Sequence, residues 1–329
     1  MPKKRPYKLF SEIKSVPVKW LLKPYIPFGK VTVVQGDPGE GKSTVALQLC
    51  ATLSKAGKLP DGTQLDEPMC SVYQCSEDGV ADTIKPRLEK ADADCSKVAI
   101  IEDLTEGLTL DDSRIEETIR DLNAKLFIID PLQAYLGKNG SLNNPIKMRN
   151  LIGGLAKIAE KYGCAIILIC HMSKTSKKNS LYRCLGSIDI PANVRSALMV
   201  VRDKDDRQVR YIFQIKNNLG EEGRAIAFKI GEEGFSWLGK CDVSLEDVLS
   251  GKPAVMTKLS QVREILPSLL KESDMRSSNV IDIFRDRGIS KRTLKAGKKD
   301  IGAVSYRKNG RWYMSLNKDN DPKQDKDNE

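Results

Sequence analysis

The hydrophobic pattern of the first 171 residues alternates between short apolar runs and stretches with helical spacing. The apolar runs predict buried strands, at Lys30–Gln35, Met69–Cys75, Val98–Ile101, Leu126–Asp130 and Ala165–Cys170. The stretches between them predict helices, at Lys42–Ala56, Gly79–Ala91, Asp111 or Asp112 to Leu122, and Ile146–Tyr162 before Gly163. This alternation is typical of an α/β fold, in which helices cover both faces of a parallel sheet.

The pattern changes after residue 195, where short strands are joined by charged turns. They are predicted at Ser196–Arg202, Val209–Lys216, Ala225–Ile230 and Phe235–Trp237. We expect these strands to form an antiparallel extension of the sheet. The stretch Lys240–Lys258 that follows is predicted to be a linker.

The last part of the chain predicts a separate small module. It has one helix within Leu259–Leu270, which Pro267 can kink, a second from Ser277 or Ser278 to Gly288, and a third after Ser290. Asn309-Gly310, between two short strand patterns, is a strong hairpin signal. Three helices and a hairpin predict a winged helix-turn-helix, whose third helix enters the DNA major groove. That helix contains five cations: Lys291, Arg292, Lys295, Lys298 and Lys299.

The net charge of +10 is concentrated at the two ends of the chain. Residues 1–19 contribute +5, residues 258–316 contribute +8 and residues 317–329 contribute −2, which leaves about −1 for the middle. A localised basic segment favours contact with nucleic acid, and the alternative is a solvated charged face. We interpret residues 1–15 as a disordered basic arm and residues 317–329 as a disordered tail.

Several classes of protein are disfavoured by the remaining composition. The longest apolar run, Ala165–Cys170, is too short to cross a bilayer, and the N-terminus lacks an apolar signal segment. The eight cysteines include no C-x-x-C pair, which disfavours a zinc site and a disulfide framework. We therefore expect a cytoplasmic protein with reduced thiols and no membrane partner.

The most specific chemical signal is a complete G-x-x-x-x-G-K-[ST] pattern between the first strand and the first helix. Its backbone N–H groups and the dipole of the following helix form a cradle for phosphates, to which the lysine adds a point charge and the serine a ligand for Mg²⁺. The alternative, a glycine-rich turn that matches by chance, does not explain the flanking strand and helix. The pattern predicts ATP and Mg²⁺ as ligands, bound by Gly36, Asp37, Pro38, Gly39, Glu40, Gly41, Lys42, Ser43 and Thr44.

Two carboxylates are the candidates for the remaining chemistry of such a site. Asp130 ends an apolar strand, which we expect beside the cradle strand, and fits the Walker B role of holding Mg²⁺ together with Ser43. Glu77 lies just past the second strand, where a carboxylate can orient and deprotonate the attacking water. A surface acidic turn is the alternative for Glu77.

His171, the chain's one histidine, follows the apolar strand after Asp130 and can contact a γ-phosphate. The alternative is a structural histidine. The loop Ser173–Ser187 that follows His171 is interpreted as a mobile loop that binds DNA, and Gly137–Pro145 is a second candidate. The alternative is that both are disordered surface loops. The cations of the first loop are Lys174, Lys177, Lys178 and Arg183.

Residues 16–240 resemble the RecA-type ATPases of the RepA/RadA-like group found in plasmids, phages and integrated elements. The resemblance rests on the segment from Val18 to Pro27, the P-loop, Ser76-Glu77-Asp78 with Arg87-Leu88, Asp130-Pro131-Leu132, His171-Met172-Ser173-Lys174 and Gly186-Ser187. It implies a RecA-like P-loop core. A second resemblance lies near the C-terminus. Residues 288–294, together with the terminal hairpin, are similar to the DNA-binding tail of some members of the group.

The resemblance also implies roles for single residues. Glu77 corresponds to the hydrolytic base and His171 to the γ-phosphate sensor. Arg195 is the best match to an arginine finger that acts in the neighbouring subunit's site. A second cation reaches across in a Lys-Asn-Arg/Lys motif of the group, which reads Lys216-Asn217-Asn218 here, so that only Lys216 remains. The catalytic set is therefore Glu77, Lys42, Asp130, His171, Arg195 and Lys216.

Together these patterns predict a DNA-dependent ATPase with a RecA-like domain at 16–240, a linker at 241–257 and a winged-helix domain at 258–316. The first hypothesis is a hexameric ring that moves on single-stranded DNA as the replicative helicase of a plasmid, phage or mobile element. The second is an ATP-controlled switch in replication initiation or recombination, with duplex DNA bound at the C-terminal domain. A P-loop kinase is a third interpretation, which leaves the C-terminal module without a role.

Overall fold

The computed structural model describes residues 5, 7–102, 107–137, 144–171, 194–250, 258–271 and 273–316. The chain divides into two compact units, Met1–Lys240 and Cys241–Glu329, which are described separately.

The first unit is built on a mixed sheet whose strands follow the order β11-β10-β9-β8-β3-β7-β6-β4-β5. The strands from β3 to β7 in sequence are β3 (Val31–Gly36), β4 (Ser71–Cys75), β5 (Val98–Ala99), β6 (Leu126–Asp130) and β7 (Ala165–His171). The remaining ones are β8 (Ser196–Arg202), β9 (Val209–Asn217), β10 (Ala225–Gly231) and β11 (Gly234–Cys241). A short hairpin, β1 (Trp20–Leu22) and β2 (Ile26–Pro27), precedes β3.

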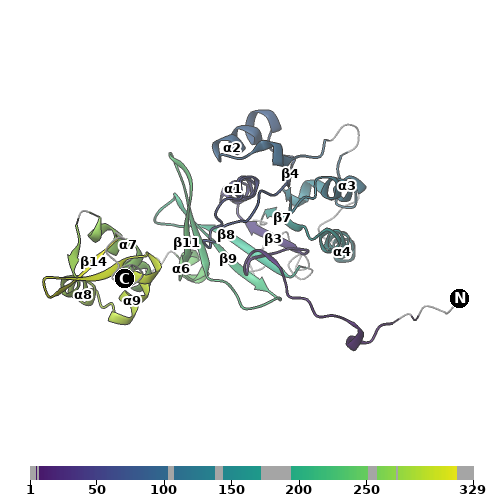
Figure 1. Cartoon of the computed structure of the whole chain (residues 1–329). Helices are drawn as coiled ribbons and strands as arrows, with labels where there is room; N and C mark the ends of the chain where they lie inside the picture. Colours follow the sequence, from purple (N-terminus) through teal and green to yellow (C-terminus); the bar gives the residue numbers. More distant parts are fainter. Residues whose placement is uncertain are drawn as a thin grey trace. The chain divides into compact units, whose positions relative to one another are not determined.

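Helices cover both faces of this sheet, as the alternating pattern predicts (Figure 1). One face packs against α1 (Lys42–Ser54) and α2 (Lys85–Lys90), and the other against α3 (Ser113–Asp121) and α4 (Pro145–Tyr162). The α/β class is therefore confirmed. Short 3-10 turns complete the unit at Phe10–Glu12, Cys95–Lys97 and Leu132–Tyr135.

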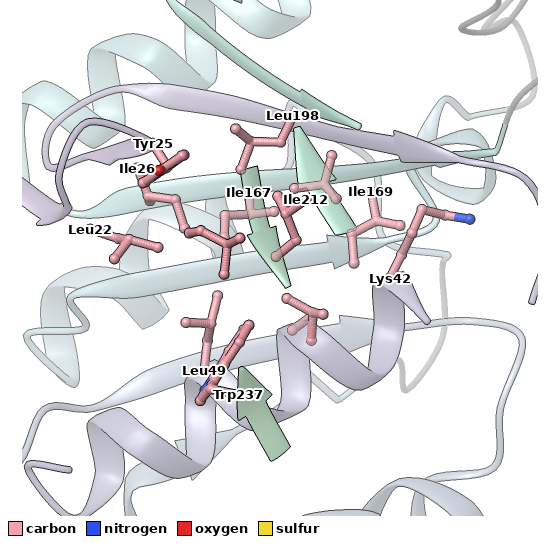
Figure 2. A pocket seen from close by; sticks show the side chains of 14 residues that line it. Leu22, Tyr25, Ile26, Lys42, Leu49, Ile167, Ile169, Leu198, Ile212 and Trp237 are labelled. Atoms are coloured by element: carbon pink, nitrogen blue, oxygen red, sulfur yellow. The ribbon is translucent and has the colours of Figure 1, made fainter. Parts of the chain in front are cut away.

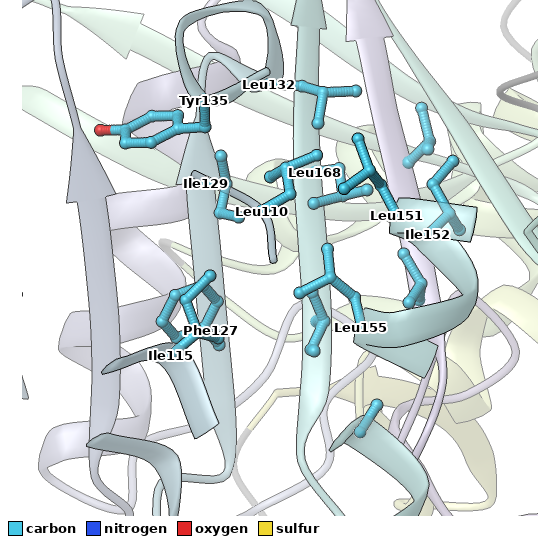
Figure 3. Close-up of a cluster of buried hydrophobic side chains, with 14 of the residues drawn as sticks. Leu110, Ile115, Phe127, Ile129, Leu132, Tyr135, Leu151, Ile152, Leu155 and Leu168 are labelled. Atoms are coloured by element: carbon cyan, nitrogen blue, oxygen red, sulfur yellow. The ribbon is translucent and has the colours of Figure 1, made fainter. Parts of the chain in front are cut away.

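Strand β7 shows why both faces are apolar. Ile166 and Leu168 pack on the α3–α4 side, whereas Ile167 and Ile169 pack on the α1–α2 side, because successive side chains of a strand point to opposite faces. Figure 3 shows the first cluster, in which Leu151 and Leu155 of α4 and Ile115 of α3 meet Phe127, Ile129 and Leu168 of the sheet.

Several predicted helix ends are confirmed. The Asp112 carboxylate caps α3 by accepting from the backbone N–H of Arg114, and Gly163 ends α4 with a left-handed φ of 63°. The predicted helix Gly79–Ala91 is less regular than expected, since a π-helical turn at Val80–Ile84 precedes α2.

Two expectations about the sheet are wrong. β8 does not begin the antiparallel extension, because it pairs in parallel with β3, and the antiparallel part begins with β9. The strand of Asp130 does not lie beside the cradle strand, because β7 is inserted between β3 and β6. Apolar periodicity identifies strands, but it contains no information on which buried strands are neighbours.

The second unit contains α6 (Leu245–Ser250), α7 (Lys258–Leu270), α8 (Ser277–Asp286), α9 (Lys291–Asp300) and the strands β12 (Met275–Arg276), β13 (Val304–Lys308) and β14 (Arg311–Ser315). The helices and the predicted hairpin around Asn309-Gly310 are present, and β12 adds a third strand beside β14. Val262, Leu266, Val280, Phe284 and Leu294 form its core. The stretch predicted as a linker is not wholly irregular, because it contains α6 with a buried Val248.

Candidate functional site

Four of the six candidate catalytic residues, Lys42, Glu77, Asp130 and His171, gather where four parallel strands end side by side. Gly36 at the end of β3 pairs with His171 of β7, and Asp130 of β6 pairs with Cys75 of β4, two residues before Glu77. Parallel strands place their carboxyl ends on one edge of a sheet. The insertion of β7 therefore places His171, rather than Asp130, next to the cradle strand.

The P-loop joins β3 to α1 in a conformation that only glycine adopts easily at two positions. Gly39 has a φ of 78° and Gly41 a φ of 93°. At Gly36 the constraint is space, because an added Cβ would lie 2.5 Å from the carbonyl oxygen of Val200. The N-cap residue of α1 is Gly41, which has no side chain to cap the helix, and the first N–H groups of a helix have no partner within it. This geometry fits the phosphates of a nucleotide.

Lys42 is buried and its ammonium group lies within the loop. Its Nζ donates to the carbonyl oxygens of Gly36, at 2.9 Å, and Asp37, at 2.8 Å. Burial lowers the pKa of Lys42, and the nearby negative charge of Asp130 opposes this effect. Figure 2 shows that the ammonium points away from the apolar cavity beneath the loop. At about 20 Å³, that cavity is too small for a nucleotide.

Asp130 is held by a neighbour that the sequence did not single out. The hydroxyl of Tyr73, on β4, donates to Asp130 Oδ2 at 2.6 Å, and both residues are buried. The pKa of Tyr73 is raised, mainly by burial and secondly by the negative charge of Asp130. The phenol therefore keeps its proton and remains a donor. This bond leaves Oδ1 of the carboxylate for a metal, and with Ser43 at the start of α1 the donor set suits Mg²⁺.

Glu77 and His171 are brought together. Glu77 Oε2 lies 3.5 Å from His171 Nε2, and 64% of the Glu77 side chain is exposed. The backbone oxygen of His171 accepts from Gln133 Nε2 at 3.4 Å. His171 Nδ1 is buried and has no hydrogen-bond partner within the described residues. A carboxylate beside a histidine can hold a water and link it to a phosphate.

Arg195 and Lys216 lie at the opposite edge of the sheet. Arg195 directly precedes β8, where Ser196 pairs with Thr32, and Lys216 pairs with Ala197. Arg195 is thus about 16 Å from Gly36 along the strand direction, at ~3.3 Å per residue. The pKa of Lys216 is lowered, first by burial and then by the positive charge of Arg195. The two cations are therefore close to each other. Neither belongs to the P-loop edge of its own chain.

The predicted DNA-binding residues divide into two groups. Lys174, Lys177, Lys178 and Arg183 lie outside the described residues, as does most of the loop after Gly137. On α9, Lys291, Arg292, Lys295 and Lys299 are exposed. Lys298 differs from this expectation, because its Nζ donates to Ser305 Oγ at 2.7 Å within the same unit. The side chain of Lys298 therefore stabilises the unit internally.

Arg202 and Arg210 also contact the P-loop, and sequence patterns did not single them out. Arg202 ends β8 and pairs across the strands with Arg210 of β9. The Nη2 atom of Arg202 donates to the carbonyl oxygen of Gly39. Strand β8 was the feature of the sequence that could have identified Arg202. Because β8 is parallel to β3, its last residue lies at the same edge of the sheet as the P-loop.

Comparison with known proteins places this site in a family. A family model described as an AAA domain matches residues 9–177, which include the P-loop, Glu77, Asp130 and His171. The chain belongs to the AAA domain family. P-loop ATPases of this kind bind ATP with Mg²⁺ and hydrolyse it.

Two curated relatives are named DNA repair protein RadA. The one from Halalkalibacterium halodurans is 23% identical over 246 residues, which cover 73% of this chain and 48% of the relative. The one from Bacillus subtilis is 22% identical over 249 residues, which cover 72% of this chain and 48% of the relative. The chain thus spans about half the length of these relatives. They and the family match indicate an ATPase of the RecA-like type.

Among solved structures, a KaiC-like protein from Pyrococcus horikoshii OT3 is similar to this chain at a TM-score of 0.48 and 18% identity. The similarity covers 67% of this chain and 99% of that one. Among the described residues, no helix is both long and apolar enough to span a bilayer.

Proposed function

We propose that this protein is a ring-forming, DNA-dependent ATPase that acts as the replicative helicase of a plasmid, phage or other mobile element. The observation that supports ATP hydrolysis most directly is the contact between Glu77 and His171 at the edge that also holds Lys42 and Asp130. A ring, single-stranded DNA and a cytoplasmic location are the further parts of the proposal.

In this proposal the P-loop amides and Lys42 bind the β- and γ-phosphates, and Ser43 and Asp130 hold Mg²⁺, which neutralises charge on the phosphates. Glu77 orients a water in line with the γ-phosphate and accepts its proton. His171 contacts the γ-phosphate and transmits its loss to the segment that follows β7. That segment contains the cations Lys174, Lys177, Lys178 and Arg183, which we propose as ligands of single-stranded DNA.

The ring is supported by the position of Arg195 and Lys216, which face away from the P-loop edge of their own chain. In a closed ring, each subunit's amino edge approaches the nucleotide of its neighbour, and Arg195 stabilises the transition-state charge there, with Lys216 as a second cation. We propose that this ring has six subunits.

The experiment that tests this proposal is a steady-state ATPase assay without DNA, with single-stranded DNA and with duplex DNA, beside a fork-unwinding assay. Single-stranded DNA is expected to stimulate hydrolysis, and forks are expected to be unwound. Lys42→Ala is the control that removes the phosphate-binding charge without touching DNA. Hydrolysis that is indifferent to both DNA forms contradicts the proposal.

A second candidate function is a non-motor ATP-controlled switch that binds a specific duplex. It is favoured by α9, where Lys291, Lys295 and Lys299 follow at intervals of four residues and share one exposed face. In both candidates we propose that the unit of residues 258–316 is a winged helix that binds duplex DNA.

Replacing Lys291, Lys295 and Lys299 by Gln is expected to weaken duplex binding about tenfold to a hundredfold and to reduce its salt dependence, because each contact displaces a counterion. Lys298→Gln is the matched control on the same helix, since its side chain bonds to Ser305. A duplex site bound tightly without unwinding favours the switch. Equal losses in the triple variant and the control contradict duplex binding by α9.

A further inference from the structure

The outer side of the P-loop is covered by residues of β8, β9 and β10. Arg202 donates from Nη2 to the carbonyl oxygen of Gly39. At Gly41 the contact is close, since an added Cβ would lie 2.9 Å from Ile230 Cδ1 and 3.2 Å from Arg210 Cδ. The ends of β8, β9 and β10 therefore form a wall behind the loop.

The Glu40 side chain joins this wall. It is half-buried, and the positive charges of Arg202 and Arg210 lower its pKa, although burial has the larger, opposite effect. Buried Glu40 Oε2, Arg202 Nε and Arg210 Nε have no hydrogen-bond partner within the described residues. Arg202 thus bonds to one P-loop residue, Gly39, and lies close enough to the next, Glu40, for its charge to act on that carboxylate.

These contacts fix the direction of a peptide group that matters for phosphate binding. In a trans peptide the carbonyl oxygen and the N–H point in opposite directions. Because Arg202 bonds to the Gly39 oxygen, the N–H of Glu40, in the same peptide, points away from Arg202. It donates to the carbonyl oxygen of Asp37 at 3.3 Å, so the contact at Gly39 supports the turn Asp37–Glu40 of the P-loop. Two glycines with positive φ leave the loop many other conformations, so an external support reduces the entropy lost when a phosphate binds.

We propose that Arg202, together with Arg210 packed beside Gly41, is a positioning residue that holds the P-loop of its own subunit in the conformation that binds nucleotide phosphates. The inference rests on the ATP binding in the proposed function, and it adds a residue pair that acts within one chain, unlike Arg195. It also gives the antiparallel strands a role at the nucleotide site.

The test compares three variants in binding of Mg·ADP, measured by calorimetry without DNA. Arg202→Gln removes the charged donor to Gly39 and is expected to raise the Kd about tenfold, the size of a hydrogen bond from a charged group. Arg202→Lys retains a charged donor and is expected to recover most of this loss. Arg207→Gln, the same charge change at an exposed position of the same hairpin, is expected to leave the Kd unchanged.

A merely structural role is separated by thermal unfolding with and without Mg·ADP. A positioning role reduces the rise in Tm that saturating ADP produces, as expected when the Kd increases. If Arg202→Gln lowers the Tm of the free protein but leaves the Kd and the ADP-induced rise at wild-type values, the proposal is overturned. Equal losses in Arg207→Gln and Arg202→Gln also overturn it, because charge alone would then explain the effect.

If Arg202→Gln does not fold, Arg210→Gln replaces it, with an expected rise in Kd of about threefold from the lost packing beside Gly41. An unchanged Kd in that variant overturns the proposal. ADP binding tests this proposal separately from the proposed function. If the wild-type protein binds ADP but its ATP hydrolysis does not respond to DNA, only the proposed function is contradicted.

Discussion

The two edges of the large sheet differ in how much of a catalytic site a single chain supplies. At the carboxyl edge, one chain brings together the P-loop, a buried aspartate with its tyrosine partner, and the Glu77–His171 contact. At the amino edge lie two neighbouring cations, Arg195 and Lys216, of which Arg195 is about 16 Å from Gly36 of its own chain along the strand direction. The difference indicates that the first edge is assembled by folding, whereas the second acquires a function only if a neighbouring subunit supplies the nucleotide.

Strands β8 and β9 connect these two edges. One end of the pair holds Arg202 and Arg210 against the P-loop, and the other end holds Arg195 and Lys216. If both proposals hold, the same two strands contact the nucleotide sites of two successive subunits. The predictions below test each end separately.

The largest effect is expected for Arg195→Ala. Loss of a trans arginine lowers the hydrolysis rate by about 10³–10⁵, while assembly, measured by light scattering, stays unchanged. Mixing this variant with Lys42→Ala provides the sharper test, because mixed rings contain interfaces with an intact P-loop facing an intact Arg195. We expect activity to reappear on mixing. Two inactive variants that stay inactive together, although they co-assemble, contradict action in trans.

A smaller loss is expected for Lys216→Ala, about a hundredfold in hydrolysis rate if this cation also faces the developing charge. The effect is expected on kcat, with nucleotide affinity unchanged, since Lys216 lies far from its own P-loop. Lys229→Ala on β10 serves as a control of the same residue type. If hydrolysis by Lys216→Ala equals that of the control, Arg195 acts without a second cation.

At the carboxyl edge, Tyr73→Phe removes the hydroxyl that donates to Asp130. The free energy of unfolding is expected to fall by about 1.5–3 kcal/mol, because a buried charged acceptor loses a hydrogen bond. Denaturant unfolding measures this change, and hydrolysis is expected to decrease several-fold because Asp130 is less well oriented. Unchanged stability and activity show that water replaces the hydroxyl.

The smallest effect is expected for Glu40→Gln and depends on pH. Burial raises the pKa of Glu40 above its usual value of 4.5, so the folded state disfavours the ionised form. The wild type therefore loses stability relative to the glutamine variant as the pH rises from 4.5 through the folded pKa. Thermal unfolding at pH 5 and pH 8 measures this difference, which is expected to be larger at pH 8. The opposite order indicates that pairing with Arg202 and Arg210 outweighs burial.

Most of the secondary structure follows from the sequence, and the reasons are local. Caps such as Asp112 and Gly163 act within one turn of their helices, and strand β6 was predicted with its observed ends because its five apolar or acidic residues are buried as one run. The P-loop was identified for the same reason, since its geometry depends on glycines and a lysine that are consecutive in the chain.

Neighbour relations depended on tertiary structure. Nothing in the sequence of β7 states that it separates β3 from β6, or that β8 runs parallel to β3, because all these strands are similarly apolar and hydrogen-bond through their backbones. The contacts of Tyr73 with Asp130 and of Arg202 with Gly39 join residues 57 and 163 positions apart. The sequence by itself determined the phosphate cradle and the residue types of a P-loop ATPase. Only the tertiary structure decided which strand ends meet at the cradle, because pairing among equivalent buried strands is selected by packing of the whole sheet.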